Sequence, residues 1–131
     1  VPPYPRSPGA NDDASGTSNV MEVFRVLIEN AVRPTRTMEF HLYSAEEVGL
    51  RGSEDIATSY LEDGKLVQGM LQLDMTGYPK MSEPQPRMIN DNTNPQLMDF
   101  LKSAATAYSS LTWYNSECGY ACSDHASFNE V

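Results

Sequence analysis

The sequence predicts an α/β fold in which a mixed, largely parallel sheet is flanked by helices. The main observation is that helical and strand-like patterns alternate along the chain. The chain has 131 residues, of which 40% are apolar, so it is long enough for one domain with a core. No internal repeat or low-complexity segment interrupts the alternation.

Three segments have the periodicity of amphipathic helices. The first begins near Ser15 and ends before Pro34, and its apolar stripe consists of Val20, Phe24, Leu27, Ile28 and Ala31. Its candidate N-caps are Asp13, Ser15 and Thr17. The second runs over residues 53–62. The third begins at Thr93-Asn94-Pro95, with proline at the first helical position, and we expect an inward face of Leu97, Phe100, Leu101, Ala104 and Tyr108.

Four further segments are predicted to be strands, namely residues 36–45, 66–75, 88–91 and 111–115. Residues 36–45 alternate between an apolar and a polar face, whereas residues 66–75 have the continuous apolar character of a buried strand. The proline-rich first eight residues and residues 77–87 are predicted to be loops.

Composition excludes several classes of function. The net charge of −9 and the absence of a basic stripe argue against nucleic-acid or phosphate binding. No run of about 18 apolar residues is present, so no transmembrane helix is expected. The first residues do not have the pattern of a signal peptide, which leaves secretion open. Neither end has a cap or a turn, and we expect an internal piece of a longer chain.

Acidic residues recur where the predicted strands meet the predicted helices. Glu46 and Glu47 follow the first strand, Asp74 ends the second, and Asp12 and Asp13 precede the first helix. In an open α/β sheet, ligands bind outside the carboxyl ends of the strands. We therefore expect these acids to converge at one edge of the sheet.

Converging carboxylates repel one another, and a divalent cation removes that repulsion. Carboxylates suit catalytic zinc sites, and two zinc ions can form a clamp that activates water. In this interpretation Glu47 ligates a metal, whereas Glu46 accepts a proton and passes it to the leaving amine. The alternative is a solvated loop with ordinary helix caps, and the residues alone favour neither interpretation.

Two cysteines, Cys118 and Cys122, lie close together in the segment CGYAC. They could be half of a zinc site, but no second pair follows at the required spacing. A small-loop disulfide is favoured instead, and it indicates an oxidising compartment.

Four motifs in this order, PGANDDASG, YSAEEVGLRGS, MLQLDMTGY and CGYACSDHAS, closely resemble the zinc aminopeptidases of peptidase family M28. The secreted fungal and bacterial members similar to leucine aminopeptidase fit best. The resemblance spans Pro8 to Ser127 and implies that residues 1–131 are the central part of a single catalytic domain. It also implies an incomplete α/β/α sandwich of the phosphorylase/hydrolase-like zinc exopeptidase fold.

The resemblance implies a role for each acidic residue. Asp12 corresponds to an aspartate that bridges two Zn²⁺ ions, and Asp13 follows it through a cis peptide bond. Glu46 corresponds to the general base, while Glu47 and Asp74 each correspond to a ligand of one zinc. Hydrolysis would use a water molecule that bridges the two ions.

The resemblance also implies a substrate-binding set. Tyr120 corresponds to a residue beside the substrate carbonyl, and Met75 to a wall of an apolar specificity pocket. Cys118 and Cys122 correspond to a disulfide of the family. The first residue of the acidic motif is Asn11, where many members have a third acid.

Two histidine ligands of the family have no counterpart in this chain. His41, within a predicted strand, and His125, in SDHAS, are not expected to replace them. We therefore expect the isolated chain to bind zinc weakly and to need the remaining part of the enzyme as a partner.

The sequence thus predicts a secreted, extracellular aminopeptidase that removes N-terminal, apolar residues from peptide substrates and binds neither nucleic acid nor membrane. Two alternatives remain: a glutaminyl cyclase related to the M28 family, and a non-catalytic secreted module that keeps the fold.

Overall fold

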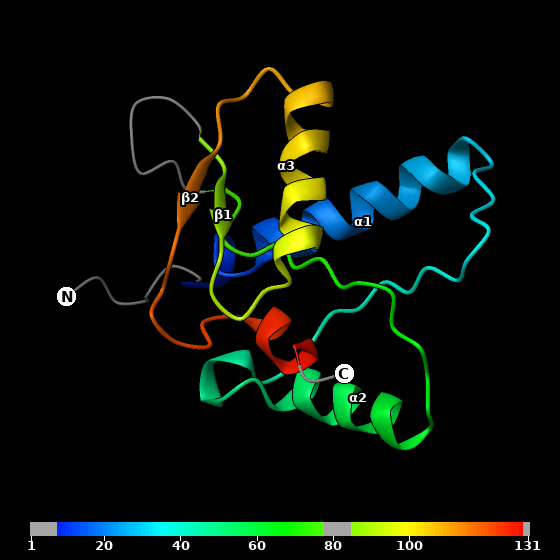
Figure 1. The fold of residues 1–131 in the computed structure, drawn as a ribbon, viewed down its shortest axis with the longest axis vertical. Coiled ribbons are helices and arrows are strands. Elements are labelled where there is room, and N and C mark those ends of the chain that lie inside the picture. The colour runs from blue at the N-terminus through cyan, green and yellow to red at the C-terminus, as the bar shows by residue number, and fades with distance from the viewer. Residues whose placement is uncertain (1–7, 78–84, 130–131) are drawn as a thin grey trace, which may run out of the picture. The chain divides into compact units, whose positions relative to one another are not determined.

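The computed structural model of the chain describes residues 8–77 and 85–129 (Figure 1). The predicted loops at residues 1–8 and 77–87 fall mostly outside these ranges. Two compact units are present. The first comprises the described parts of residues 1–42 and 73–78, and the second those of residues 43–72 and 79–131. No helix in the described residues is long and apolar enough to cross a membrane.

The described residues form three α-helices, two short strands and three short 3₁₀ helices (Figure 1). In chain order they are η1 (Pro8–Ala10), α1 (Ala14–Glu29), η2 (Glu46–Val48), α2 (Arg51–Glu62), β1 (Arg87–Ile89), α3 (Pro95–Tyr108), β2 (Tyr114–Ser116) and η3 (Asp124–Phe128).

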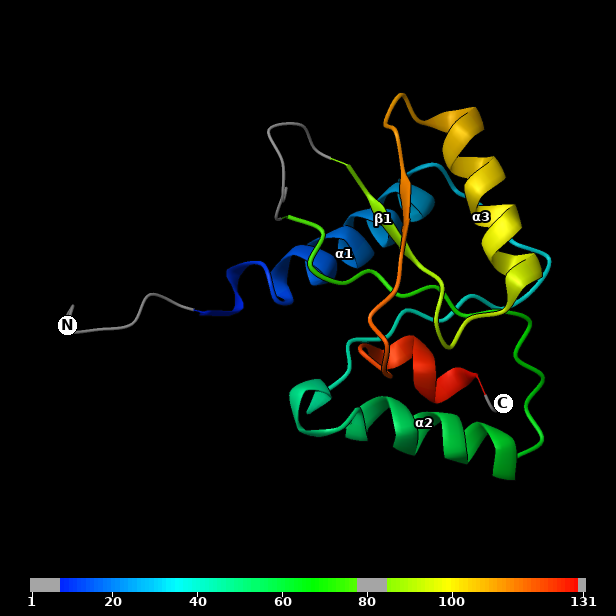
Figure 2. The same ribbon diagram turned by 60° about the vertical axis from the view of Figure 1, so that its left-hand side comes forward.

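The second unit contains a β1–α3–β2 crossover. The two strands are parallel, with Arg87 opposite Tyr114 and Ile89 opposite Ser116. Figure 2 shows the strands side by side, with α3 connecting them. Parallel strands need such a crossover, so this unit confirms the predicted α/β class with parallel pairing. Both strands overlap the predicted segments 88–91 and 111–115, although β2 begins three residues later than predicted.

The prediction of strands at residues 36–45 and 66–75 is wrong for the described residues. Neither segment joins a hydrogen-bonded ladder. Exposed apolar side chains in them include Met38, Leu42 and Leu66. Alternating or continuous apolar patterns predict which residues favour a strand, whereas a strand exists only when a neighbour accepts and donates its backbone hydrogen bonds.

Helix α1 starts as predicted and ends earlier. The carboxylate of Asp13 caps its N-terminus by accepting from the Gly16 backbone N–H at 3.0 Å. At the other end the Asn30 side chain bonds to the Val26 carbonyl, and Ala31 has φ of 50°, so the helix stops before Pro34. The predicted apolar stripe remains largely exposed, including Phe24, which contacts Phe40 edge-on at 5.2 Å.

Helix α3 begins at Pro95, as predicted, because the Asn94 side chain accepts from the backbone N–H groups of Gln96 and Leu97. Its predicted inward face is only partly correct. Phe100 is 67% exposed and Tyr108 is 91% exposed, whereas Met98 is buried. The helical period of the apolar residues predicts a stripe along α3, but only part of that stripe is buried in the structure.

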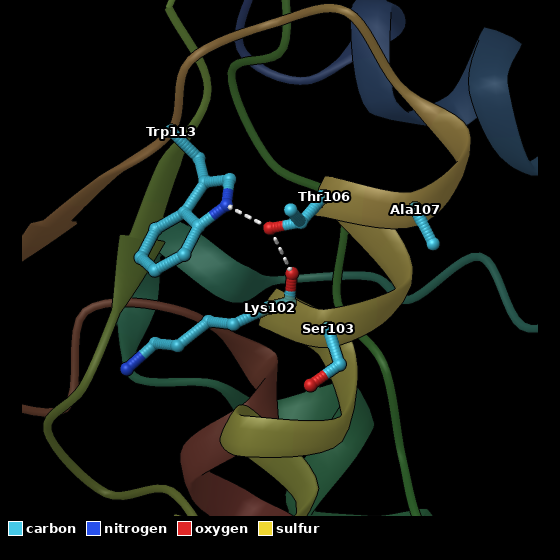
Figure 3. Close-up of a pocket in the computed structure, with 5 residues that line it drawn as sticks. All are labelled: Lys102, Ser103, Thr106, Ala107 and Trp113. Atoms are coloured by element: carbon cyan, nitrogen blue, oxygen red, sulfur yellow. Dashed lines mark hydrogen bonds between the residues drawn. The ribbon is translucent and has the colours of Figure 1, made fainter.

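One side of α3 and the neighbouring Trp113 line a shallow depression of about 410 Å³ (Figure 3). The Trp113 indole N–H donates to the Thr106 hydroxyl at 3.2 Å, and the Lys102 ammonium lies 5.7 Å from the indole ring. These contacts hold the Trp113 ring beside α3, where the ring lines the depression.

The α2 helix packs against η3. Ser53, fully buried on α2, shares a hydrogen bond of 2.9 Å with Ser127. The Phe128 ring lies between Tyr43 and Tyr60, with centroid distances of 6.2 and 6.3 Å. The hydroxyl pair and the aromatic contacts of Phe128 together hold the segment after the cysteine loop against α2.

We expect the Gly52→Ala substitution to destabilise the protein by about 2 kcal/mol, because it overpacks a backbone contact. A Cβ atom at Gly52 would lie 2.5 Å from the Ser44 carbonyl oxygen and 2.9 Å from its nitrogen. Urea unfolding measures the loss. Gly69→Ala is the matched control, since its Cβ would meet only the two methyl groups of the Leu97 side chain, at 3.4 and 3.7 Å. Equal stability of the Gly52 and Gly69 variants would contradict this prediction.

Candidate active site

The first group of candidate residues surrounds the start of α1. Asp12 is exposed, Asp13 is half-buried, and the peptide bond between them is cis. Besides capping α1, the Asp13 carboxylate accepts from the Met75 backbone N–H at 3.1 Å. One side chain therefore joins the helix start to the segment that carries Asp74 and Met75.

Two more polar contacts join the same segments. The Asn11 side-chain oxygen accepts from the Gly77 backbone N–H at 2.9 Å, and the Asn19 amide donates to the Thr76 hydroxyl at 2.7 Å. The Ser15 hydroxyl donates to the Asn11 carbonyl at 2.6 Å and steadies that residue. Asn11, where the sequence departs from an acidic motif, thus has a structural role as a hydrogen-bond acceptor.

Burial raises the pKa of Asp13 above its usual range, and repulsion from Asp74 and Asp12 adds to this effect. The hydrogen bonds from Gly16 and Met75 act in the opposite direction but do not reverse it. The charges of Asp12 and Asp74 therefore both act on Asp13. The convergence of these acids at a metal site stays a prediction.

Glu46 and Glu47 lie on η2 in the second unit. Two flanking residues other than glycine have left-handed backbones, Ala45 with φ of 60° and Leu50 with φ of 54°. The Glu46 carbonyl accepts from the backbone N–H groups of Gly49 and Leu50 at 3.0 and 2.9 Å. Left-handed residues of this kind cost free energy and often occur at functional sites. The Glu46 side chain is half-buried and that of Glu47 is exposed, so the adjacent acids have different surroundings.

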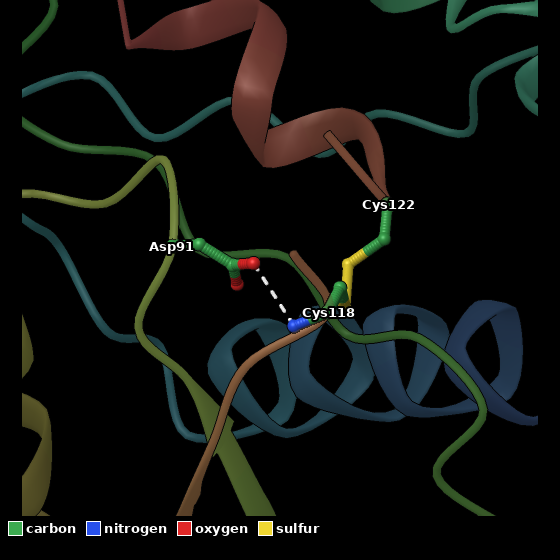
Figure 4. A group of neighbouring side chains, drawn as sticks. All are labelled: Asp91, Cys118 and Cys122. Carbon is green, nitrogen blue, oxygen red and sulfur yellow. Dashed lines mark hydrogen bonds between the residues drawn. A yellow bond between two sulfur atoms is a disulfide. The ribbon is translucent and has the colours of Figure 1, made fainter. Parts of the chain in front are cut away.

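The cysteine loop joins β2 to η3. Cys118 and Cys122 form a disulfide, and Tyr120 between them is 68% exposed. The side chains of Asp91, Cys118 and Cys122 are close enough together to suggest a metal site (Figure 4). The disulfide leaves no thiolate to bind a cation, so this group is a structural cluster.

Asp91 was missed as a candidate by sequence analysis, which placed it in a strand. Its carboxylate accepts from the backbone N–H groups of Cys118 at 2.9 Å and Gly119 at 2.6 Å. Burial raises the pKa of Asp91, but the hydrogen bonds from Gly119 and Cys118, with the nearby His125, outweigh it and lower the pKa overall. In the structure Asp91 and Cys118 each lie two residues beyond a paired residue of the parallel strands, a relation that the residue types alone do not show.

We expect the stabilising effect of Asp91 to decrease at acid pH. A carboxylate whose pKa is lowered by folding stabilises the folded state fully above the unfolded pKa of about 4, and loses this effect as the pH falls through its folded value. The difference in unfolding free energy between the parent and Asp91→Asn should therefore decrease from pH 6 towards pH 2. Urea unfolding at several pH values measures this difference. An increase in the difference as the pH falls would refute the prediction that folding lowers the pKa of Asp91.

The two histidines contact groups within the chain. His41 Nε2 lies 3.2 Å from a Glu39 carboxylate oxygen, and His125 Nε2 lies 3.1 Å from the Asp91 carbonyl oxygen. These contacts accord with the expectation that neither histidine is a zinc ligand, which stays a prediction.

The candidate residues divide between the two units. The first holds Asp12, Asp13, Asp74 and Met75, and the second holds Glu46, Glu47, Cys118, Cys122 and Tyr120. In the first unit the contacts above join the start of α1 to the segment that carries Asp74 and Met75. In the second unit the contacts above join Cys118 to Cys122. The convergence of Glu46 and Glu47 with the other acids stays a prediction.

Comparison with known proteins agrees with the motifs. The model of peptidase family M28 matches residues 2–131. A probable aminopeptidase of Saccharomyces cerevisiae, YDR415C, is 46% identical over 97% of this chain and 35% of its own length. Leucine aminopeptidase 1 of Fusarium vanettenii is 44% identical over 100% of this chain and 36% of its own length. The chain therefore spans about a third of the curated relatives it matches.

Solved structures with the same fold come from Legionella pneumophila. LapB matches 94% of this chain and 34% of its own chain, with a TM-score of 0.89 and 34% identity. The LapA aminopeptidase matches 97% of this chain and 35% of its own, with a TM-score of 0.83 and 37% identity. These likenesses confirm the predicted fold class.

Proposed function

Because the chain belongs to peptidase family M28, we propose that it is the central part of a single catalytic domain of a zinc-dependent aminopeptidase. The complete catalytic domain, which is as long as the relatives above, removes N-terminal, apolar residues from peptides. The observation that carries this proposal is the 44% identity to a leucine aminopeptidase over a segment that includes every candidate residue.

The donor set of this chain fits zinc in part. Asp12 and Glu47 have exposed carboxylates, and Asp74 has a half-buried one. Carboxylate oxygens are among the ligands that catalytic zinc uses. These three residues would hold two Zn²⁺ ions together with ligands from the rest of the domain. Bound there, zinc would supply Lewis-acid polarisation of the scissile carbonyl and of a water molecule.

Proton transfer falls to Glu46, as a general base that accepts a proton from water and returns it to the departing amine. Its half-burial suits this role, because a carboxylate shielded from bulk water keeps the proton within the site. The hydroxyl of Tyr120 would donate to the oxyanion, and Met75 would form part of an apolar wall for the N-terminal side chain.

Two features support a secreted protein. The Cys118–Cys122 disulfide forms and persists in oxidising compartments. The net charge of −9 suits a protein that stays soluble without nucleic-acid or membrane partners.

Hydrolysis of leucyl-p-nitroanilide by the catalytic domain tests the proposal. We expect turnover that is removed by a chelator and restored by Zn²⁺, with about two zinc ions per domain by elemental analysis. Conversion of a peptide with N-terminal glutamine into its pyroglutamyl form, with release of ammonia, would instead identify a glutaminyl cyclase. Absence of both activities, with no bound zinc, would indicate a non-catalytic module.

The 131-residue chain alone is expected to bind Zn²⁺ weakly and to show no turnover of leucyl-p-nitroanilide. Three carboxylates without histidine ligands leave each ion with an incomplete set of protein ligands. Isothermal titration with Zn²⁺ measures the affinity, and the same assay measures turnover. Robust hydrolysis by the isolated chain would show that the missing ligands are dispensable.

A further inference from the structure

We propose that Asp91 is a positioning residue that fixes the Cys118–Cys122 loop and thereby places Tyr120. The proposal rests on the function proposed above for Tyr120. The residues that carry it all belong to the second unit, in which β1, β2, the cysteine loop and η3 follow or contact one another.

The parallel register places Asp91 opposite the start of the loop. Ile89 pairs with Ser116, and the Asn90 backbone N–H extends the ladder by donating to the Ser116 carbonyl at 3.0 Å. Asp91 and Cys118 therefore leave the sheet at the same level. At the position of Asp91, a short side chain that accepts hydrogen bonds can reach the first backbone N–H groups of the cysteine loop.

One carboxylate oxygen of Asp91, Oδ2, accepts from both Cys118 and Gly119 (Figure 4, which draws the first of these bonds). Hydrogen bonds to an ionised acceptor are stronger than neutral ones. Gly119 has φ of 83°, a left-handed conformation that turns the chain directly before Tyr120. The bonds therefore fix the turn from which the Tyr120 side chain projects.

The loop is also held at its far end. The disulfide joins Cys122 to Cys118, and the buried Ser123 and Asp124 lead into η3, which packs on α2. His125 adds a contact to the carbonyl of Asp91 itself at 3.1 Å. Asp91 thus contacts residues on both sides of a loop whose tip, Tyr120, is exposed.

Amide hydrogen exchange in the catalytic domain tests the contact without relying on activity. In Asp91→Ala we expect the Gly119 amide to exchange at least about tenfold faster, because its charged acceptor is lost. Asp91→Asn keeps one acceptor oxygen and should give a smaller increase. Asp99→Asn, on an exposed site of α3, makes the same charge change and should leave Gly119 unaffected. Unchanged exchange in Asp91→Ala and Asp91→Asn would overturn the proposal.

A double-mutant cycle with Tyr120→Phe tests whether Asp91 acts through Tyr120. We expect Asp91→Asn to lower kcat for leucyl-p-nitroanilide about tenfold, with less than a threefold change in KM. In the Tyr120→Phe background the same substitution should lower kcat less than about twofold. A merely structural role would give the full loss in both backgrounds, and that result would overturn the proposal.

Two further outcomes distinguish a failure of this proposal from a failure of the proposed function. If the catalytic domain shows neither turnover of leucyl-p-nitroanilide nor bound zinc, the proposed function fails, whereas faster Gly119 exchange in Asp91→Asn still supports positioning of the loop by Asp91. If Glu46→Gln is inactive but Tyr120→Phe is unimpaired, the general base stands and the part of this proposal that concerns Tyr120 is overturned.

Discussion

Glu46→Gln in the catalytic domain is expected to lower kcat by about 10²–10⁴-fold while zinc remains bound, the range typical for loss of a general base. Glutamine has nearly the size of glutamate and still hydrogen bonds, but it cannot accept a proton. Because Glu46 is proposed to move a proton and not to hold a metal, the zinc content should not change. Steady-state kinetics with leucyl-p-nitroanilide and elemental analysis of the same sample measure both effects.

The neighbouring acid provides the contrast. Glu47→Gln should reduce both turnover and zinc content, since a carboxamide is a poorer ligand for zinc than a carboxylate. Glu54→Gln, exposed in the first turn of α2, removes the same charge nearby and should alter neither. If Glu46→Gln loses zinc, or if Glu47→Gln keeps both zinc and activity, the assignment of the two roles is wrong.

Gly16→Ala is expected to destabilise the protein by about 3 kcal/mol, at the upper end of the cost of overpacking. Alanine in a helix is otherwise favoured over glycine by up to about 1 kcal/mol, so the sign of the effect is informative. A Cβ atom at Gly16 would overlap the Leu73 carbonyl oxygen and lie 2.5 Å from both oxygens of the Asp13 carboxylate. The substitution thus separates α1 from the segment that carries Asp74.

Urea unfolding of the parent and variant measures this effect. Gly9→Ala in the same unit is the control, because no atom lies within 4 Å of the Cβ that it would add. We further expect Gly16→Ala to weaken Zn²⁺ binding, since Asp74 and the Asp13 cap are displaced together. If the Gly16→Ala variant is as stable as the parent, the close approach of the Gly16 and Leu73 backbones is refuted.

The helices were predicted well from sequence because their hydrogen bonds and caps are local. Asn94 and Pro95 define the start of α3 within two residues of chain, and Asp13 caps α1 from three residues away. The faces of these helices were predicted less well. Phe100 and Tyr108 satisfy the helical period but remain exposed, because burial is decided by distant segments that the period does not encode.

The predictions of strands and of site residues differ in how much they depend on contacts with distant segments. Residues 36–45 and 66–75 have strand-like patterns, but no neighbour pairs with them in the described residues. The acids at Asp12, Glu46 and Asp74 were identified because junction positions are visible in the sequence. Asp91 was missed because its partners are backbone N–H groups, which carry no signal in the residue types of the loop.

The short parallel pair also has a consequence for handling the protein. Within the described residues each strand bonds to its partner on one side, so two strand edges present backbone groups without a ladder. Open edges of this kind pair readily with other chains, and exposed apolar side chains such as Leu66 and Leu71 favour such association. Expression of residues 1–131 alone should therefore give soluble aggregates that lengthen with concentration, and a charged substitution at Leu66 should delay them.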